Sequence, residues 1–134
     1  MPWEYSVDST RDAILTQAYG VVTDDELRAG LAAVFTDPRV HPDFRVFADY
    51  SGATNILVTV DTMVFAAQNR LKILSSQARH AFFAPSTLAY GLARMFQYYA
   101  EYHSPMAGPV EVFRGRPEAL AWLNEGVPPE KLLT

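Results

Sequence analysis

The stretch FRVFADYSGATNILVTVDTM, residues 44–63, predicts a buried strand, a loop and the beginning of a helix. Residues 44–49 are mostly aromatic and aliphatic, as buried strands are. A loop rich in hydroxyl groups is predicted from Gly52 to Asp61, and a helix from about Asp61 to Ala78. The apolar face of this helix is predicted from residues at helical spacing, Met63, Val64, Ala67, Leu71, Leu74 and Ala78. A strand that leads into a helix in this way indicates an α/β fold.

On the N-terminal side, the sequence predicts a hairpin followed by a helix. The hairpin has two strands and ends at a glycine: residues 3–8, residues 12–19 and Gly20. The helix begins at Thr23, which has the capping-box spacing to Glu26. Gly30 lies inside this helix and indicates that another group packs closely against it.

Further elements are predicted on the C-terminal side: a strand at 80–84, a helix from Ser86 or Thr87 to about His103, a strand at 110–115 and a helix from Pro117 to Gly126. The helix that ends near His103 is predicted to bury one stripe: Leu88, Leu92, Met95, Tyr99 and Tyr102. The predicted order is ββαβαβαβα, in one domain of residues 1–126 with a C-terminal tail at 127–134. We expect the tail to be rigid only if its leucines, Leu132 and Leu133, pack against the domain.

The composition restricts the partners and the location. The formal net charge is −4, which gives no broad attraction to nucleic acid or to an anionic membrane. There is no cysteine, so disulfides and thiolate chemistry are excluded. No apolar run approaches the ~20 residues that span a bilayer, so membrane insertion is not expected. The N-terminal sequence has no pattern of a secretory signal, and we expect a cytoplasmic protein.

No catalytic constellation can be assembled from the sequence. A glycine-rich phosphate loop, a nucleophile elbow and a convincing pair of carboxylates are all missing. His41, His80 and His103 have neither metal-ligand spacing nor an evident acidic partner. We therefore predict no catalytic residue, no metal site and no cofactor.

Four segments resemble a known family: GVVTDDELRAGL, FRVFADYSGAT, LAYGLARMF and VFRGRPEALAWL. Together they cover most of the chain from Gly20 to Leu123, and they are similar to the STAS superfamily, in particular its SpoIIAA-like (STAS/SEC14-domain) bacterial branch. The resemblance implies a single α/β domain with a mixed β-sheet and covering helices. It supports the fold more than any activity.

The resemblance also implies a site at the start of the second helix. In anti-sigma-factor antagonists, a DLSG strand end leads to a serine that a partner kinase phosphorylates. DYSG stands here at Asp49 to Gly52, and Thr62 has the position of that serine. A phosphate there would meet free backbone amides and the positive end of the helix dipole. Alternatively, Thr59 or Asp61 caps the helix and Thr62 only fills its first turn.

Aromatic residues outside the predicted stripes form a second group of candidates. Tyr90, Arg94 and Tyr98 are spaced four apart, so the guanidinium of Arg94 could stack on a ring. A ligand pocket, a subunit interface and additional core are all consistent with such a pattern. SEC14-like relatives bind lipids, which would imply an apolar pocket formed by Phe65, Phe82, Tyr90, Arg94 and Phe96.

The leading functional hypothesis is a non-enzymatic regulatory or protein-interaction module. Its partner surface would include Ser51, Thr54 and Phe65. The alternative is a carrier or sensor of a small apolar or lipid-like ligand. A homodimer formed through the aromatic residues would compete with both, since it would occupy the same surface.

Overall fold

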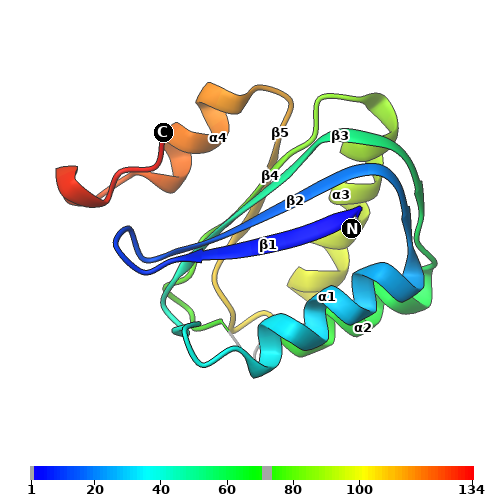
Figure 1. The fold of residues 1–134 in the computed structure, drawn as a ribbon, viewed down its shortest axis with the longest axis horizontal. Coiled ribbons are helices and arrows are strands. Elements are labelled where there is room, and N and C mark those ends of the chain that lie inside the picture. Colours follow the sequence, from blue (N-terminus) through cyan, green and yellow to red (C-terminus); the bar gives the residue numbers. More distant parts are fainter. Residues whose placement is uncertain (1, 71–73) are drawn as a thin grey trace.

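Five strands form one mixed sheet in the computed structural model, which describes residues 2–70 and 74–134. The strands are β1 (Trp3–Asp8), β2 (Ala13–Thr23), β3 (Arg45–Leu57), β4 (His80–Phe83) and β5 (Val110–Phe113). They lie side by side in sequence order; β1 is antiparallel to β2 and the remaining neighbours are parallel (Figure 1). The helices are α1 (Asp24–Thr36), α2 (Val60–Asn69), α3 (Thr87–His103) and α4 (Arg116–Leu123), followed by a short 3-10 turn at Pro129–Lys131. The predicted order of elements is confirmed.

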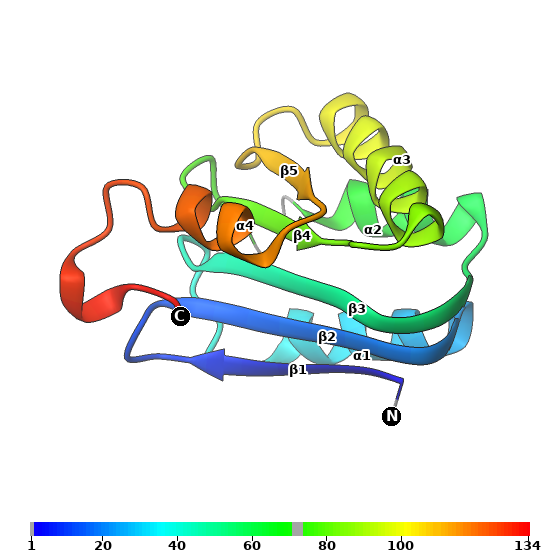
Figure 2. The ribbon, with the colours of Figure 1, turned by 90° about the horizontal axis from the view of Figure 1, so that it is seen from above.

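The two faces of the sheet have different covers. Helices α1, α2 and α3 lie on one face, and α4 with the C-terminal segment lies on the other (Figure 2). Successive strand residues point to opposite faces, so each strand contributes to two cores. In β3, for example, Ala48 belongs to the core under α2 and α3, whereas Phe47 packs with Leu123 of α4.

The strands β2 and β3 are longer than predicted. Gly20 does not end β2, which continues to Thr23 with irregular register around Gly20 and Val21. The segment from Gly52 to Leu57, predicted as a loop, is strand, because it pairs with residues 19–23 of β2. This ribbon of two strands extends past the last residue of β4 (Figure 2). Cross-strand hydrogen bonds therefore override the turn-forming composition.

In helix α1, the close packing predicted at Gly30 is confirmed, but the predicted capping box at Thr23 is incomplete. Thr23 is the N-cap residue, but its hydroxyl bonds to the Glu26 carboxylate at 3.2 Å and not to a backbone amide. Gly30 lies under the indole of Trp3: a β-carbon at Gly30 would lie 2.1 Å from a ring atom. The glycine is thus required for the contact between α1 and β1.

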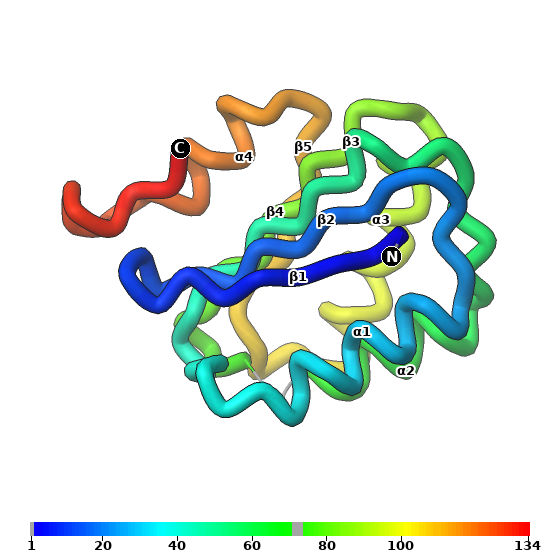
Figure 3. The backbone as a smooth tube through the Cα atoms, viewed as in Figure 1, coloured from blue at the N-terminus to red at the C-terminus, as the bar shows by residue number. Residues whose placement is uncertain are grey.

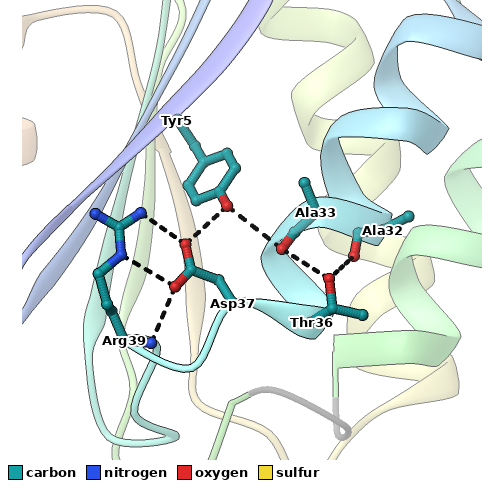
Figure 4. Close-up of polar contacts among 6 residues, drawn as sticks. All are labelled: Tyr5, Ala32, Ala33, Thr36, Asp37 and Arg39. Carbon is teal, nitrogen blue, oxygen red and sulfur yellow. Dashed lines mark hydrogen bonds and ion pairs between the residues drawn. The ribbon is translucent and has the colours of Figure 1, made fainter.

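Polar contacts connect the C-terminal end of α1 to β1 (Figure 4). The hydroxyl of Tyr5 donates a 2.8 Å hydrogen bond to Asp37, and a guanidinium nitrogen of Arg39 lies 2.7 Å from the same carboxylate. The bonds from Arg39 hold the pKa of Asp37 well below its usual range. This cluster fixes where the chain leaves the helix.

Helix α2 is shorter than predicted. It ends at Asn69, the predicted core residue Leu71 lies outside the described residues, and Leu74 and Ala78 are buried from a non-helical segment. That segment packs tightly against the loop before β5, since a β-carbon at Gly108 would lie 1.7 Å from the Ala78 carbonyl oxygen. Tertiary packing therefore ends the helix before its apolar pattern does.

Helix α3 has the predicted bounds but buries a different face. Ser86 caps it by accepting a hydrogen bond from the Ala89 amide. The residues that face the sheet are small, Ala89, Ala93 and Ala100, together with the polar Gln97. The predicted stripe is wrong for Leu88, Met95 and Tyr102, which are exposed, whereas its other members, Leu92 and Tyr99, are half-buried.

The C-terminal segment docks on the domain. Leu133 is buried among α4 and the sheet, and its backbone exchanges two 2.9 Å hydrogen bonds with the side chain of Asn124. The buried guanidinium of Arg45 donates to Asn124 and to the carbonyl of Lys131. The chain's end thus lies against α4, well away from the N-terminus (Figure 3). Within the described residues, no helix has both the length and the apolar character needed to cross a membrane.

Candidate functional site

A cavity of about 120 Å³ lies between the sheet and the helices α1, α2 and α3. Its floor consists of two rows of side chains that cross three strands in register. The first row is Ile14, Val46 and His80, and the second is Thr16, Ala48 and Phe82. Ala48 stands between two larger residues, so the floor is recessed at its centre. The cavity follows from this alternation of large and small side chains in neighbouring strands.

The three helices form the walls, and most of the side chains that line them are apolar. Helix α1 contributes Leu27, Leu31, Val34 and Phe35; helix α2 contributes Met63, Ala66 and, at its end, Arg70; helix α3 contributes Ala89, Leu92, Ala93 and Phe96. Three of these are alanines, which leave space that larger residues would fill. The site is an apolar chamber with few polar groups, the usual character of a small-molecule site.

The lining of this cavity includes the polar residues Arg70, His80 and Thr16, besides the aromatic residues Trp3 and Tyr50. Arg70 is 4% exposed; its terminal nitrogens donate to the Gly108 carbonyl at 2.7 Å and to the Ser104 hydroxyl at 3.4 Å. Its Nε is buried without a hydrogen-bond partner among the described residues. Burial lowers the pKa of the guanidinium to about 10, which leaves it charged at neutral pH.

His80 lies beside the same cavity and is neutral. Its Nδ1 is buried and has no hydrogen-bond partner in the described part of the chain, and its ring stacks on Phe82 with centroids 4.6 Å apart. Burial, together with the positive charge of Arg70, lowers the pKa of the imidazole well below its usual value. The cavity therefore offers one fixed cation and one neutral imidazole in an apolar surrounding.

Only some of the predicted pocket residues line the cavity. Phe82 and Phe96 line the cavity, with ring centroids 5.4 Å apart. Phe65, Tyr90 and Arg94 are not part of its lining. The guanidinium that stacks on Tyr90 belongs to Arg114, at 4.3 Å from the ring centroid, whereas Arg94 is exposed.

Sequence reasoning missed Arg70 and His80 as members of this site, although each left a signal. Arg70 is seven residues after the buried Met63, so it continues the apolar stripe of α2 as a charged residue. His80 and Phe82 are two residues apart in β4, so both point to the same face of the strand, the one that lines the cavity. A polar residue at an apolar position is the pattern that identifies both.

The start of α2 is a second region of interest. Thr59 is the N-cap, and its hydroxyl accepts from the Thr62 amide at 3.4 Å. The carboxylate of Asp24, at the start of α1, accepts from the Thr59 amide at 2.8 Å and from its hydroxyl at 2.9 Å. These bonds, the one from the amide foremost, lower the pKa of Asp24. Hydrogen bonds therefore connect the N-terminal ends of α1 and α2.

Thr62 is fully buried in this structure. Its hydroxyl accepts a 2.9 Å hydrogen bond from Nε of Arg28, whose guanidinium also lies 4.6 Å from the ring centroid of Phe65. Phe65 itself is half-buried, 6.4 Å from Phe35 of α1. The hydroxyl could therefore accept a phosphoryl group only after α1 and α2 separate.

Residues of the predicted partner surface lie in different surroundings. Ser51 and Thr54 are exposed on β3, and the Ser51 hydroxyl bonds to Asp49 at 2.6 Å. Three large apolar residues in this region are exposed: Leu57 at 56%, Val60 at 48% and, on the paired strand β2, Val21 at 45%. Since Val22 is buried and Ile56 lines the cavity, Val21 and Leu57 occupy the other face of the β2–β3 ribbon.

Comparison with solved structures identifies the fold. An uncharacterised protein of the DUF3478 family with a SpoIIAA-like fold, from Shewanella loihica PV-4, superposes with a TM-score of 0.56 at 17% identity, over 90% of this chain and 93% of that one. The anti-sigma factor antagonist SpoIIAA in its unphosphorylated form gives a TM-score of 0.55 at 14% identity, over 93% of this chain and 99% of that one. No protein-family model and no curated protein matches the sequence. The chain has the STAS/SpoIIAA-like fold, as its sequence predicted.

Proposed function

We propose that this STAS/SpoIIAA-like domain is a non-enzymatic binding module that takes a small amphiphile with an anionic head group in the cavity under α1, α2 and α3. The observation that carries the proposal is Arg70, a buried guanidinium at the cavity wall whose Nε has no partner among the described residues. The anionic head would bind there, and the apolar part would occupy the space above Ala48.

The charge of Arg70 requires an explanation, because a buried cation without an opposite charge is costly. Its two terminal nitrogens bond to neutral oxygens of Gly108 and Ser104, and no carboxylate pairs with it in the described residues. A carboxylate or phosphate in the cavity would supply the missing charge and an acceptor for Nε. His80 adds a second buried polar atom near the same place.

The size of the cavity limits the ligand. An engineered protein cavity of roughly 150 Å³ holds benzene, and this one has about 120 Å³. In this conformation the apolar part of the ligand would be a ring or a chain of about six carbons. A long acyl chain would require the helices to move away from the sheet.

Binding of a matched ligand series tests this function. Titration calorimetry with hexanoate and with hexanol separates the head group from the tail. We expect the carboxylate to bind at least about tenfold more tightly than the alcohol, the effect of one charge-assisted hydrogen bond. Arg70→Met keeps the apolar stem and removes the charge, so it should abolish this preference while the alcohol still binds.

Two variants locate the ligand in the cavity. Ala66→Leu places extra carbon atoms at the cavity wall and should prevent binding of both ligands. Ala32→Leu makes the same change on an exposed position of α1 and should leave binding intact. Binding that survives Ala66→Leu, or no binding by the wild-type domain, would contradict the proposal.

A protein-interaction module is the second candidate, and the exposed Val21, Leu57 and Val60 favour it. Such apolar side chains at one end of a sheet are typical of a protein contact. The regulatory partner would bind there, beside Ser51 and Thr54. A photo-crosslinking residue at Leu57 should give one discrete adduct in the native cell, whereas one at the exposed Gln68 should not. Equal labelling from the two positions would argue against this surface.

A further inference from the structure

The outer face of α3 carries an apolar stripe that none of the described residues covers. Leu88 is 46% exposed, Met95 39%, Tyr98 66% and Tyr102 73%, and the exposed Gly91 lies in line with them. Figure 2 shows α3 along the outer margin of the molecule. The opposite face of the helix packs on the sheet through alanines. Helix α3 therefore has two apolar faces, of which the fold uses one.

The spacing of this stripe is that of two paired helices. Residues 88, 91, 95, 98 and 102 alternate steps of three and four, which are the a and d positions of a heptad repeat. Helix α3 has 17 residues, a length of ~25 Å, so the stripe runs along nearly all of it. An exposed seam with this period fits another helix better than it fits a flat surface.

We propose that a second copy of this chain covers the seam, with the two α3 helices antiparallel about a twofold axis. The side-chain sizes suit this pairing. If Met95 lies opposite Tyr98 of the second copy, the same symmetry places Gly91 opposite Tyr102 of the second copy. The largest side chain of the seam then meets the position with none, and this happens twice because a twofold contact is self-complementary.

The charges beside the seam favour the same arrangement. Arg94 and Glu101 precede Met95 and Tyr102 and lie on one flank of the seam, seven residues apart, which is too far for them to pair with each other. Both are exposed, and neither forms an ion pair within the described residues. In an antiparallel dimer each Arg94 lies near Glu101 of the second copy, so two ion pairs form across the axis. A net charge of −4 makes an anionic membrane surface a poorer partner.

Charge exchange tests the dimer and its register together. Sedimentation velocity should show the wild-type chain dimerising with a Kd on the order of micromolar, as small interfaces do. Arg94→Glu and Glu101→Arg each place like charges together twice and should raise Kd by at least about tenfold. The double variant Arg94→Glu with Glu101→Arg should restore the wild-type Kd. These positions are exposed, so the variants should fold normally.

Glu130→Arg makes an equal charge change on an exposed residue outside the seam and serves as the control. A chain that remains monomeric throughout the micromolar range would overturn the proposal. So would a dimer whose Kd neither single variant raises, or a double variant that fails to recover the wild-type Kd. None of the seam residues lines the cavity, so failure of the dimer and failure of ligand binding are separate results.

Discussion

Nε of Arg28 on α1 donates a 2.9 Å hydrogen bond to the hydroxyl of Thr62 on α2, and this hydroxyl is fully buried. The position that resembles the phosphorylated serine of anti-sigma-factor antagonists is thus an interhelical contact in this chain. Thr59 caps the helix, as the structural alternative predicted. Phosphorylation of Thr62 stays a prediction, and it would require the two helices to part.

The energy of the Arg28–Thr62 contact can be measured with an isosteric change. Thr62→Val keeps the shape and removes the acceptor, so the free energy of unfolding should fall by about 1 kcal/mol. Thr54→Val makes the same change on the exposed part of β3, where an effect within about 0.5 kcal/mol is expected. Urea denaturation of both variants provides the comparison. Equal effects at the two positions would show that the buried hydrogen bond contributes nothing.

Two glycines inside helices should respond oppositely to alanine. Gly30→Ala would drive a β-carbon to 2.1 Å from the Trp3 ring, and we expect a loss of about 1–3 kcal/mol from overpacking. At Gly91 no atom lies within 4 Å of the added carbon, so Gly91→Ala should stabilise dilute protein by up to ~1 kcal/mol through helix propensity. Thermal denaturation would decide, and stabilisation by both changes would mean that Trp3 moves freely.

The pH dependence of stability should contain a contribution from His80. Its folded pKa lies well below 6.5, so below about pH 6.5 the unfolded chain binds a proton that the folded chain does not. Stability is therefore lost as the pH falls, by up to ~1.4 kcal/mol per pH unit until the folded pKa is reached. His80→Phe keeps a ring beside Phe82 and removes this contribution. Urea unfolding at pH 7.5 and pH 5.5 should show a smaller decrease for the variant, and equal decreases would refute the assignment.

The leucines of the C-terminal segment form another matched pair. Leu133 is 7% exposed and packs under α4, so Leu133→Ala should cost about 2–4 kcal/mol. Leu132 is 37% exposed, and Leu132→Ala should cost less than about 1 kcal/mol. Hydrogen exchange of the backbone after Gly126 should quicken only in the first variant. If both exchange alike, the segment does not depend on the leucine for its docking.

Local signals predicted many boundaries correctly. Ser86 and Thr59 cap helices with their hydroxyls, and the strand predicted from the aromatic and β-branched residues of 3–8 is β1. These features depend on residues close in the chain, whose geometry a short sequence fixes. The candidate site was predicted only in part: Phe82 and Phe96 line the cavity, but Arg70 and His80 were not assigned to it. The guanidinium of Arg70 is held in the site by hydrogen bonds to Ser104 and Gly108, which are distant from it in the chain.

By itself, the sequence determined the order of the elements, most of their bounds and the resemblance that predicts the STAS/SpoIIAA-like fold. Only the tertiary structure decided how far β3 extends, because its residues 52–57 obtain their hydrogen bonds from β2. It also decided which face of α3 is buried. The helix lies close to the short strands β4 and β5, so small residues such as Ala93 fit against the sheet and Met95 and Tyr102 are left outside. Periodicity reports that a helix has an apolar face, whereas the partner's shape selects which of two faces it buries.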